Sequence, residues 1–267
     1  MSQYIALTYW DVVLAAVFLV INGALSIWLD LRLERQLAIA AIRMIVQLIL
    51  IGFVLKALFA ISSPWLTGLA ALTMGAFAGR EIWARQERAL SGVWGYGLGG
   101  AAMMFAGVLV TTIALTTQIQ PDPWWTPRLA LPLFGMILGN TMTGVSLGLD
   151  TLNSSVHRER PAIEAQLLLG ASRWSATAPF VRRALRSGFM PIINAMAATG
   201  VVSLPGMMTG QILSGVDPTE AVKYQLLIMF LIGGATGFGV LLAVLGNIWR
   251  LTDERHRLRL DRLRDAK

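Results

Sequence analysis

The feature that most constrains this chain is a succession of long apolar stretches separated by short polar segments. A membrane-crossing helix needs roughly 20 predominantly apolar residues. The 267 residues are 55% hydrophobic and only 14% charged, which leaves little room for a soluble domain. We expect an all-α integral membrane protein, one transmembrane domain over residues 1–267, with about seven transmembrane helices. The expected spans are roughly 8–29, 39–61, 64–79, 93–117, 129–149, 188–213 and 221–248.

The basic residues indicate an orientation for these spans. All but three of the 22 Lys and Arg lie on one side of the seven-span arrangement, the exceptions being Lys56, Arg128 and Lys223. Basic residues concentrate in cytoplasmic loops, so we expect the N-terminus outside and the C-terminus inside. An even number of spans would destroy this segregation. We expect the cytoplasmic tail, about 250–267, to be a solvated helical extension near anionic lipid or a partner.

Composition also restricts the function. The chain has no cysteine, and His157 and His256 both lie in polar segments. Disulfides, thiolate zinc sites, catalytic cysteines and an intramembrane histidine site are therefore excluded. A membrane enzyme would need acid–base or metal-binding groups at membrane depth, and the sequence offers no such cluster. The net charge of +7 is explained by the basic residues of the expected cytoplasmic loops, so we expect no nucleic-acid partner. We expect a multi-pass protein of the cell (inner) membrane.

Several glycine pairs spaced by four residues indicate close packing between helices. Gly135 and Gly139 form one such pair, and Gly144 and Gly148 form another. This spacing lets helix backbones approach one another, and we expect about half of the pairs to make such contacts.

A basic segment of about residues 152–187 interrupts the apolar spans and predicts a helix–turn–helix loop. Pro161 and Glu164 suit the first turn of a helix. Gly170 suits its C-terminus, and Ser172 can cap a second helix that fills the rest of the segment. On these features alone, a simple surface helix–turn–helix is the alternative to a functional loop.

The run from Glu164 to Gly170 resembles the EAA-type coupling loop of ABC-transporter permeases, with Gln166 in place of the second alanine. The resemblance implies that the short helix docks into a groove on a separate ATPase subunit. The chain lacks the phosphate-binding sequence G-x-x-x-x-G-K-[ST], so we expect no cofactor here and ATP with Mg²⁺ in the partner. The expected ATPase-coupling residues are Glu164, Ala165, Leu167, Leu168, Gly170 and Ser172.

The sixth span contains the dipeptide Pro205-Gly206. Proline inside a helix removes a backbone hydrogen bond and clashes with the preceding turn, so we expect a break or kink near residues 203–206. Discontinuous membrane helices form sites and hinges in transporters, and a packed kink is the alternative. One face of this span would carry Met196, Gly200, Ser203 and Met207.

Other polar or soft side chains extend this candidate transport path. The Asn140 amide at membrane depth needs a pore or an interhelical partner. Methionine thioethers are soft ligands that suit weak metal contacts, although packing is their usual role. Glu81 could receive a cation, but an ion pair with a nearby arginine is the simpler interpretation. The candidate path or hinge residues are Glu81, Asn140, Met142, Ser203, Pro205, Gly206, Met207 and Met208, without an assigned metal-ligand set.

Residues 201–225, together with 139–142 and 169–172, resemble the FetB-type permeases of metal exporters, a family that includes plant aluminium-tolerance permeases. The resemblance covers essentially the whole chain. It implies ATP-driven export of a metal ion, most simply iron, by two permease and two ATPase subunits.

Two alternatives remain open from the residues themselves. One is an ABC permease for a non-metal substrate such as a nucleotide-sugar. The other is an ATP-independent metal channel or secondary transporter, which would not need the loop and would tolerate a bulky residue at Gly170. The direction of transport and the substrate follow from the resemblance alone.

Overall fold

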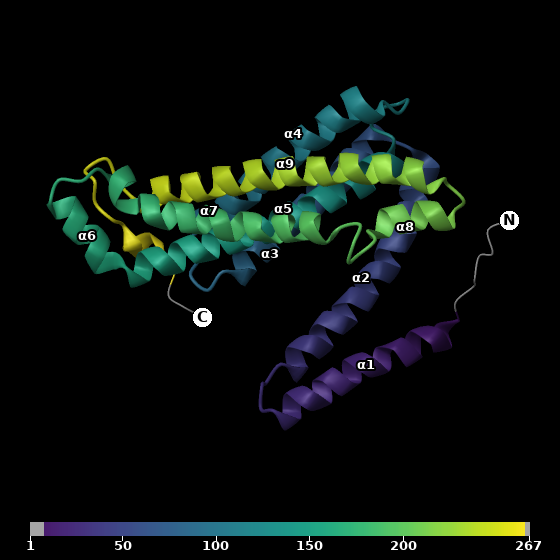
Figure 1. The fold of residues 1–267 in the computed structure, drawn as a ribbon, viewed down its shortest axis with the longest axis horizontal. Coiled ribbons are helices and arrows are strands. Elements are labelled where there is room, and N and C mark those ends of the chain that lie inside the picture. The colour runs from purple at the N-terminus through teal and green to yellow at the C-terminus, as the bar shows by residue number, and fades with distance from the viewer. Residues whose placement is uncertain (1–7, 265–267) are drawn as a thin grey trace. The chain divides into compact units, whose positions relative to one another are not determined.

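The computed structural model describes residues 8–264, and helices dominate that range (Figure 1). It confirms the expected all-α fold, with no β-strand among the described residues. The chain divides into two compact units, Met1–Ser62 and Ser63–Lys267.

The first unit is a pair of apolar helices, α1 (Tyr9–Trp28) and α2 (Glu34–Ile61). Buried Ser26 secures the turn between them. Its hydroxyl donates to the Glu34 carboxylate at 3.1 Å and accepts from the Leu33 N–H at 2.9 Å.

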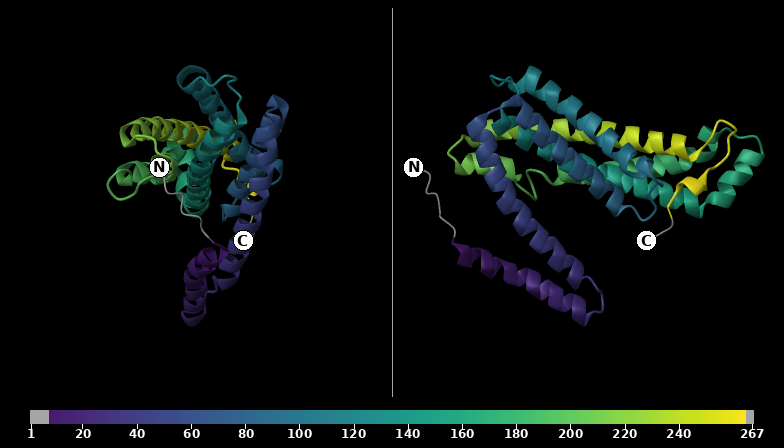
Figure 2. Two further views of the ribbon diagram at one scale, coloured as in Figure 1. Left: turned by 90° about the vertical axis from the view of Figure 1, so that its right-hand side faces the viewer. Right: turned by 180° about the vertical axis from the view of Figure 1, so that it is seen from behind.

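The second unit is a helical bundle whose helices α5, α7 and α9 run side by side (Figures 1 and 2). Helices α3 and α4 pack against α5, and α4 also packs against α9. Within this unit, α6 lies at one end of the bundle and α8 at the other (Figure 1). The bounds are α3 Pro64–Arg85, α4 Val93–Ile113 with a π-helical extension Ala114–Ile119, α5 Pro127–Arg158, α6 Arg160–Leu168, α7 Arg173–Ala198, α8 Gly206–Leu213 and α9 Pro218–Leu251.

Glycines bring α5 and α7 into backbone contact. A Cβ atom at Gly144 would lie 2.7 Å from the carbonyl oxygen of Gly188, and one at Gly148 would lie 3.3 Å from Val244. Gly139, by contrast, faces open space, with nothing within 4 Å of its Cβ position. Of the two glycine pairs named above, the pair at 144 and 148 therefore makes close helix contacts at both positions.

Five of the described helices are long and apolar enough to cross a membrane. Helices α3 and α7 are not among them, and both contain charged residues, including Arg80 in α3 and Arg182 in α7. The seven-span count and the orientation therefore stay predictions. The five helices are Trp10–Trp28, Glu34–Ile61, Val93–Ile119, Pro127–Arg158 and Pro218–Leu251.

The helix ends differ from the expected loop boundaries at residues 152 and 187, and the extent of the loop outside the membrane stays a prediction. Helix α5 continues to Arg158, and α7 runs without interruption from Arg173 to Ala198. The helix continues because Ala184 and Gly188 are buried on one face, while the arginines near them stay exposed on the other. Only α6 and its two flanking turns separate the long helices.

The expected helical tail over about 250–267 was wrong for residues 252–264, and residues 265–267 lie outside the described range. Residues 252–264, called here the C-terminal strap, form turns and isolated bridges with a single 3₁₀ turn at Leu260–Arg262. Leu258, Leu260 and Leu263 pack against the main core of the second unit. A helix extending into solvent would leave these leucines exposed, so their burial stabilises the strap on the bundle.

Candidate functional site

The most elaborate polar structure lies where α6, the start of α7, the end of α9 and the strap meet. We call this part of the second unit the basic end. Helix α6 stops in a Schellman turn, in which the Gly170 N–H donates to Leu167 O at 3.1 Å and the Ala171 N–H to Gln166 O at 3.0 Å. Gly170 has φ of +88°, the left-handed conformation that glycine adopts without a steric penalty. The predicted helix end at Gly170 is confirmed.

Helix α7 begins directly after this turn. Ser172 is its N-cap residue, and the Ser172 hydroxyl accepts the Ser175 N–H at 3.2 Å, as predicted. The two caps leave only Leu169 to Ser172 between α6 and α7. Such a short, hydrogen-bonded connection fixes the direction of α6 relative to α7.

The leucines of α6 have two different environments. Ile163 is buried, and Leu167 packs partly buried against the core, so both hold α6 on the bundle. Leu168 and Leu169 are 89% and 88% exposed. Thus Leu168 and Leu169 face outward, whereas Leu167 packs on the bundle, and the ATPase-coupling role of Leu167 and Leu168 stays a prediction.

The remaining predicted coupling residues lie on the same short helix. Ala165 is exposed, and Glu164 forms an ion pair with Arg160 at 2.7 Å across one turn. Because α6 begins at Arg160, Glu164 lies beyond the first turn, so the expected placement beside the positive helix end was wrong. The charge of Glu164 is balanced by the Arg160 side chain instead.

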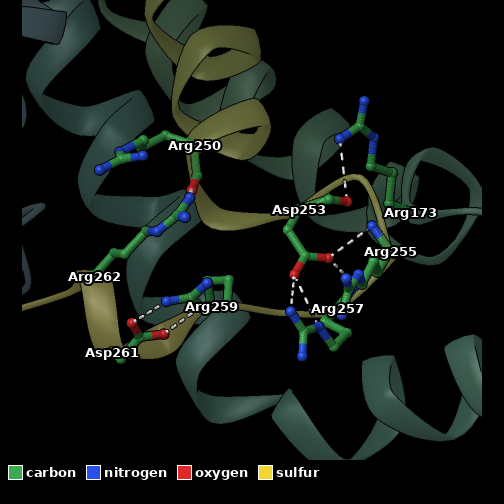
Figure 3. A network of polar contacts seen from close by, with 8 residues as sticks. All are labelled: Arg173, Arg250, Asp253, Arg255, Arg257, Arg259, Asp261 and Arg262. Carbon is green, nitrogen blue, oxygen red and sulfur yellow. Dashed lines mark hydrogen bonds and ion pairs between the residues drawn. The ribbon is translucent and has the colours of Figure 1, made fainter.

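The C-terminal strap holds the start of α7. The Arg173 N–H donates to His256 Nδ1 at 3.2 Å. Arg173 Nη1 donates to the Asp253 carbonyl at 3.2 Å (Figure 3). Further along the strap, the Arg264 N–H donates to Ala89 O at 2.8 Å, and the Ser91 N–H donates to Arg262 O at 2.7 Å. The strap therefore connects the α6–α7 turn with the loop between α3 and α4.

Carboxylates give the strap its shape. Asp253 accepts the backbone N–H groups of Arg257 at 2.8 Å and Arg255 at 3.0 Å, and the Arg257 Nε at 2.8 Å. These donors, the Arg257 N–H first, hold the pKa of Asp253 below its ordinary value. Arg259 forms a two-pronged pair with Asp261, at 2.9 and 2.8 Å, and lowers the pKa of Asp261 to about 2.

A buried amide network lies inside the same end of the bundle. Asn247 Nδ2 donates to Asn153 Oδ1 at 2.8 Å, and Asn153 Nδ2 donates to Arg88 O at 2.7 Å and to Gln86 Oε1 at 3.2 Å. Asp150 adds a bond from the Glu87 N–H at 2.7 Å. The residue pattern does not predict this network, although amides near the ends of apolar helices are a signal for buried polar contacts. The network ties the residues that follow α3 to α5 and α9.

The predicted break in the sixth span is present. Helix α7 ends at Ala198, and α8 starts at Gly206, with Pro205 as its N-cap residue. The Ser203 N–H donates to Ala198 O at 3.1 Å, and the Gly200 N–H donates to Ser203 O at 2.9 Å, which closes a tight turn.

The expected stripe of Met196, Gly200, Ser203 and Met207 was wrong. Gly200 has φ of +88°, so the helix does not continue through it. Met207 packs partly buried against the second core cluster, and Met208 is also partly buried. The turn exposes Val201 and Val202 instead, at 89% and 82%.

The other predicted path residues are not brought together with this turn. Asn140 is exposed on α5, and its Nδ2 donates to Met136 O of its own helix at 2.8 Å. Met142 packs against the main core. Glu81 lies 3.9 Å from Arg85, the ion pair expected from the sequence. Within residues 8–264, no group of three His, Cys, Asp or Glu side chains is arranged to hold a metal ion.

The apolar helices and the comparisons with known proteins define the class of this protein, a multi-pass α-helical membrane protein. The chain belongs to the family described as Uncharacterised protein family (UPF0014), whose model matches residues 9–251. This confirms the family resemblance inferred from residues 201–225. No solved structure matches the chain.

Three relatives illustrate the range of the family. A UPF0014 membrane protein of Synechocystis sp. is 40% identical over 212 residues, 78% of this chain and 80% of the relative. The Probable iron export permease protein FetB of Escherichia coli is 30% identical over 259 residues, 97% of each chain. The Protein ALUMINUM SENSITIVE 3 of Arabidopsis thaliana is 33% identical over 225 residues, 83% of this chain and 80% of the relative.

Proposed function

We propose that this chain is the membrane permease of an ATP-driven exporter, that a separate cytoplasmic ATPase docks on α6, and that the cargo is a metal ion, most simply iron. The observation that carries the proposal is the pair of leucines on the α6 turn. Leu168 and Leu169 are almost fully exposed at the polar end of the bundle, next to charged side chains. Exposed apolar anchors flanked by polar groups are typical of a docking surface.

The connections of α6 support a mechanical role. A load on α6 would pass into α5 through the one-residue connection at Glu159 and into α7 through the capped turn at Gly170. Helices α5 and α7 are in backbone contact at Gly144 and Gly188, so they would move as one body. The strap and the amide network would hold the surrounding helices to that body.

The break between α7 and α8 is the proposed hinge. Movement of α7 would be absorbed between Ala198 and Gly206, where backbone hydrogen bonds leave the helical pattern. Asn140, on α5, supplies an exposed amide at membrane depth, which suits a path lined by a second copy of the chain. The working unit would be two permeases with two ATPase subunits.

The metal cargo rests on the relative named as a probable iron export permease, which aligns along 97% of both chains. The chain has no cysteine, so methionines are its only sulfur donors. Methionine binds hard Fe³⁺ poorly, so weak contacts with Fe²⁺ along the path are chemically consistent. Weak contacts allow release, which an exporter needs.

Reconstitution in liposomes tests the proposal. The chain would be co-expressed with an ABC ATPase from a neighbouring gene, and ATP hydrolysis would be measured across a panel of Fe²⁺, Mn²⁺, Zn²⁺ and Al³⁺. Stimulation of hydrolysis by Fe²⁺, with ATP-dependent Fe²⁺ movement across the bilayer, is expected. Tight ATPase binding without stimulation by any metal would retain the permease and overturn the metal cargo. Metal flux that needs no ATPase would overturn the ATP-driven mechanism.

A further inference from the structure

A cavity at the basic end is lined by basic side chains that the proposed coupling mechanism does not use. Its volume is about 210 Å³, and its walls include Arg173, Arg250, Arg262 and Trp249. Asp253 and Glu254 also contribute to the lining. Asp253 is already paired with Arg257 at 2.8 Å, so three arginines and one carboxylate outside an ion pair, Glu254, line the cavity. The side chains of Arg250 and Arg262 lie on one side of Asp253, and that of Arg173 lies on the other (Figure 3).

The guanidinium groups have donors left for a ligand. Arg173 uses one nitrogen for the Asp253 carbonyl, and Arg262 uses one for the Arg250 carbonyl at 2.6 Å (Figure 3). An arginine side chain has five N–H donors, so each of these keeps several. Burial lowers the pKa of Arg262, and the positive charges of Arg250 and Arg259 lower it further. An anion in the cavity would relieve this repulsion between like charges.

The position of the cavity indicates where such an anion would come from. Helix α9 has 34 residues. At about 1.5 Å per residue such a helix is roughly 50 Å long, more than the hydrocarbon layer of about 30 Å. Its last turn, which carries Trp249 and Arg250, would therefore reach the headgroup layer.

The aromatic side chains around the cavity agree with that depth. The Arg250 guanidinium lies 5.0 Å from the centre of the Trp94 ring, and the Arg264 guanidinium lies 5.4 Å from the Trp83 ring. Trp249, beside the cavity, is 55% exposed. Indole rings and arginines with apolar stems concentrate at the headgroup level of membranes.

We propose that this cavity binds the phosphate group of an anionic membrane phospholipid, with Arg250 as the principal contact and Arg262 as a flanking contact. The bound headgroup would brace the end of α9 against the strap. The site depends on membrane insertion but not on the identity of the cargo or of the ATPase, so it stands or falls separately from the proposed function.

The test compares lipid binding by variants of the full chain purified in an uncharged detergent. Binding of phosphatidylglycerol and of phosphatidylcholine would be followed by native mass spectrometry and by the shift in melting temperature. Arg250→Gln removes the guanidinium group that makes the main contact. It keeps the Arg250 backbone carbonyl, which accepts the hydrogen bond from Arg262 in the strap. Arg255→Gln is the matched control, because Arg255 is exposed on the strap outside the cavity and contributes only its backbone N–H to Asp253.

Phosphatidylglycerol, but not phosphatidylcholine, is expected to bind the unmodified chain and raise its melting temperature. The apparent Kd for phosphatidylglycerol should rise about tenfold in Arg250→Gln, stay unchanged in Arg255→Gln and recover partly in Arg250→Lys. Equal weakening in the two glutamine variants would overturn the site in favour of general surface attraction, and equal binding of both lipids would overturn it as well. Displacement of phosphatidylglycerol by millimolar inorganic phosphate would overturn the lipid source.

Discussion

His256 in the C-terminal strap accepts a hydrogen bond from the backbone N–H of Arg173, the first residue of α7, at 3.2 Å. A residue 83 positions later in the chain thus caps the helix that follows the proposed coupling helix. The strap continues to the α3–α4 loop, where it pairs with Ala89 and Ser91. The basic end is therefore a closed assembly in which α6 is the exposed member.

Loss of the Asp253 carboxylate should release the strap. Asp253→Asn weakens the acceptor for three donors from Arg255 and Arg257. We expect faster hydrogen exchange across residues 252–264 and at the Ser91 N–H, measured by mass spectrometry on the full chain. Glu254→Gln, at the exposed neighbouring position, should leave exchange unchanged. Unchanged exchange in Asp253→Asn would show that apolar packing alone holds the strap.

The strap should loosen in acid. The pKa of Asp261 is lowered to about 2 by Arg259, and that of Asp253 is also lowered. A carboxyl group with a lowered pKa stabilises the folded strap above its ordinary pKa of about 4, and this contribution is lost as the pH falls toward the lowered value. Carbon-13 NMR of the labelled aspartates should give Asp261 a midpoint near 2, and Arg259→Gln should return it toward 4. A midpoint near 4 in the unmodified chain would contradict the pairing.

The contact between α5 and α7 should tolerate no side chain at Gly144. A Cβ there would lie 2.7 Å from Gly188 O and 2.8 Å from the Thr236 methyl group. Gly144→Ala should destabilise the protein by roughly 1–3 kcal/mol, seen as a lower melting temperature in detergent. Gly139→Ala, on the same helix and facing open space, should be neutral or slightly stabilising. Equal effects would mean that the helices are not in backbone contact.

The buried amide network should matter for stability and Asn140 should not. Asn153→Ala leaves Asn247 and Gln86 without their buried partner, at a cost of about 1–3 kcal/mol for each unsatisfied group. Asn140→Ala removes only a bond to Met136 in its own helix, so the melting temperature should hardly change. If Asn140 borders the path, its variant should reduce transport at normal stability. Normal transport would remove Asn140 from the path.

Features that depend on neighbouring residues were predicted most reliably from the sequence. The turn at Gly170 and the cap at Ser172 depend on neighbouring backbone groups, so residue type and spacing were enough to predict them. The break at Pro205 followed in the same way, because the ring of proline acts on its own helix.

Long-range pairing could not be read from the same patterns. Asn153 and Asn247 are 94 positions apart, and no periodicity indicates that they meet. The strap was mistaken for a helix because its charges suggested solvent, whereas Leu258 and Leu263 anchor it to the core. The predicted methionine stripe was wrong because α7 ends at Ala198 and Gly200 adopts a left-handed conformation directly after the Thr199 cap. Counting residues by helix face assumes a continuous helix and cannot predict such an end.

The central claim is that a separate ATPase docks on the exposed leucines of α6, and ATPase binding by a double variant tests it most directly. Leu168→Ser with Leu169→Ser should leave the melting temperature unchanged, because both side chains are already exposed at 89% and 88%. Leu213→Ser, which is 73% exposed on α8 at the other end of the bundle, is the control. Affinity for the ATPase in liposomes should fall at least tenfold in the double variant and not in the control. Unchanged ATPase affinity and unchanged ATP-driven transport in the double variant would contradict the account.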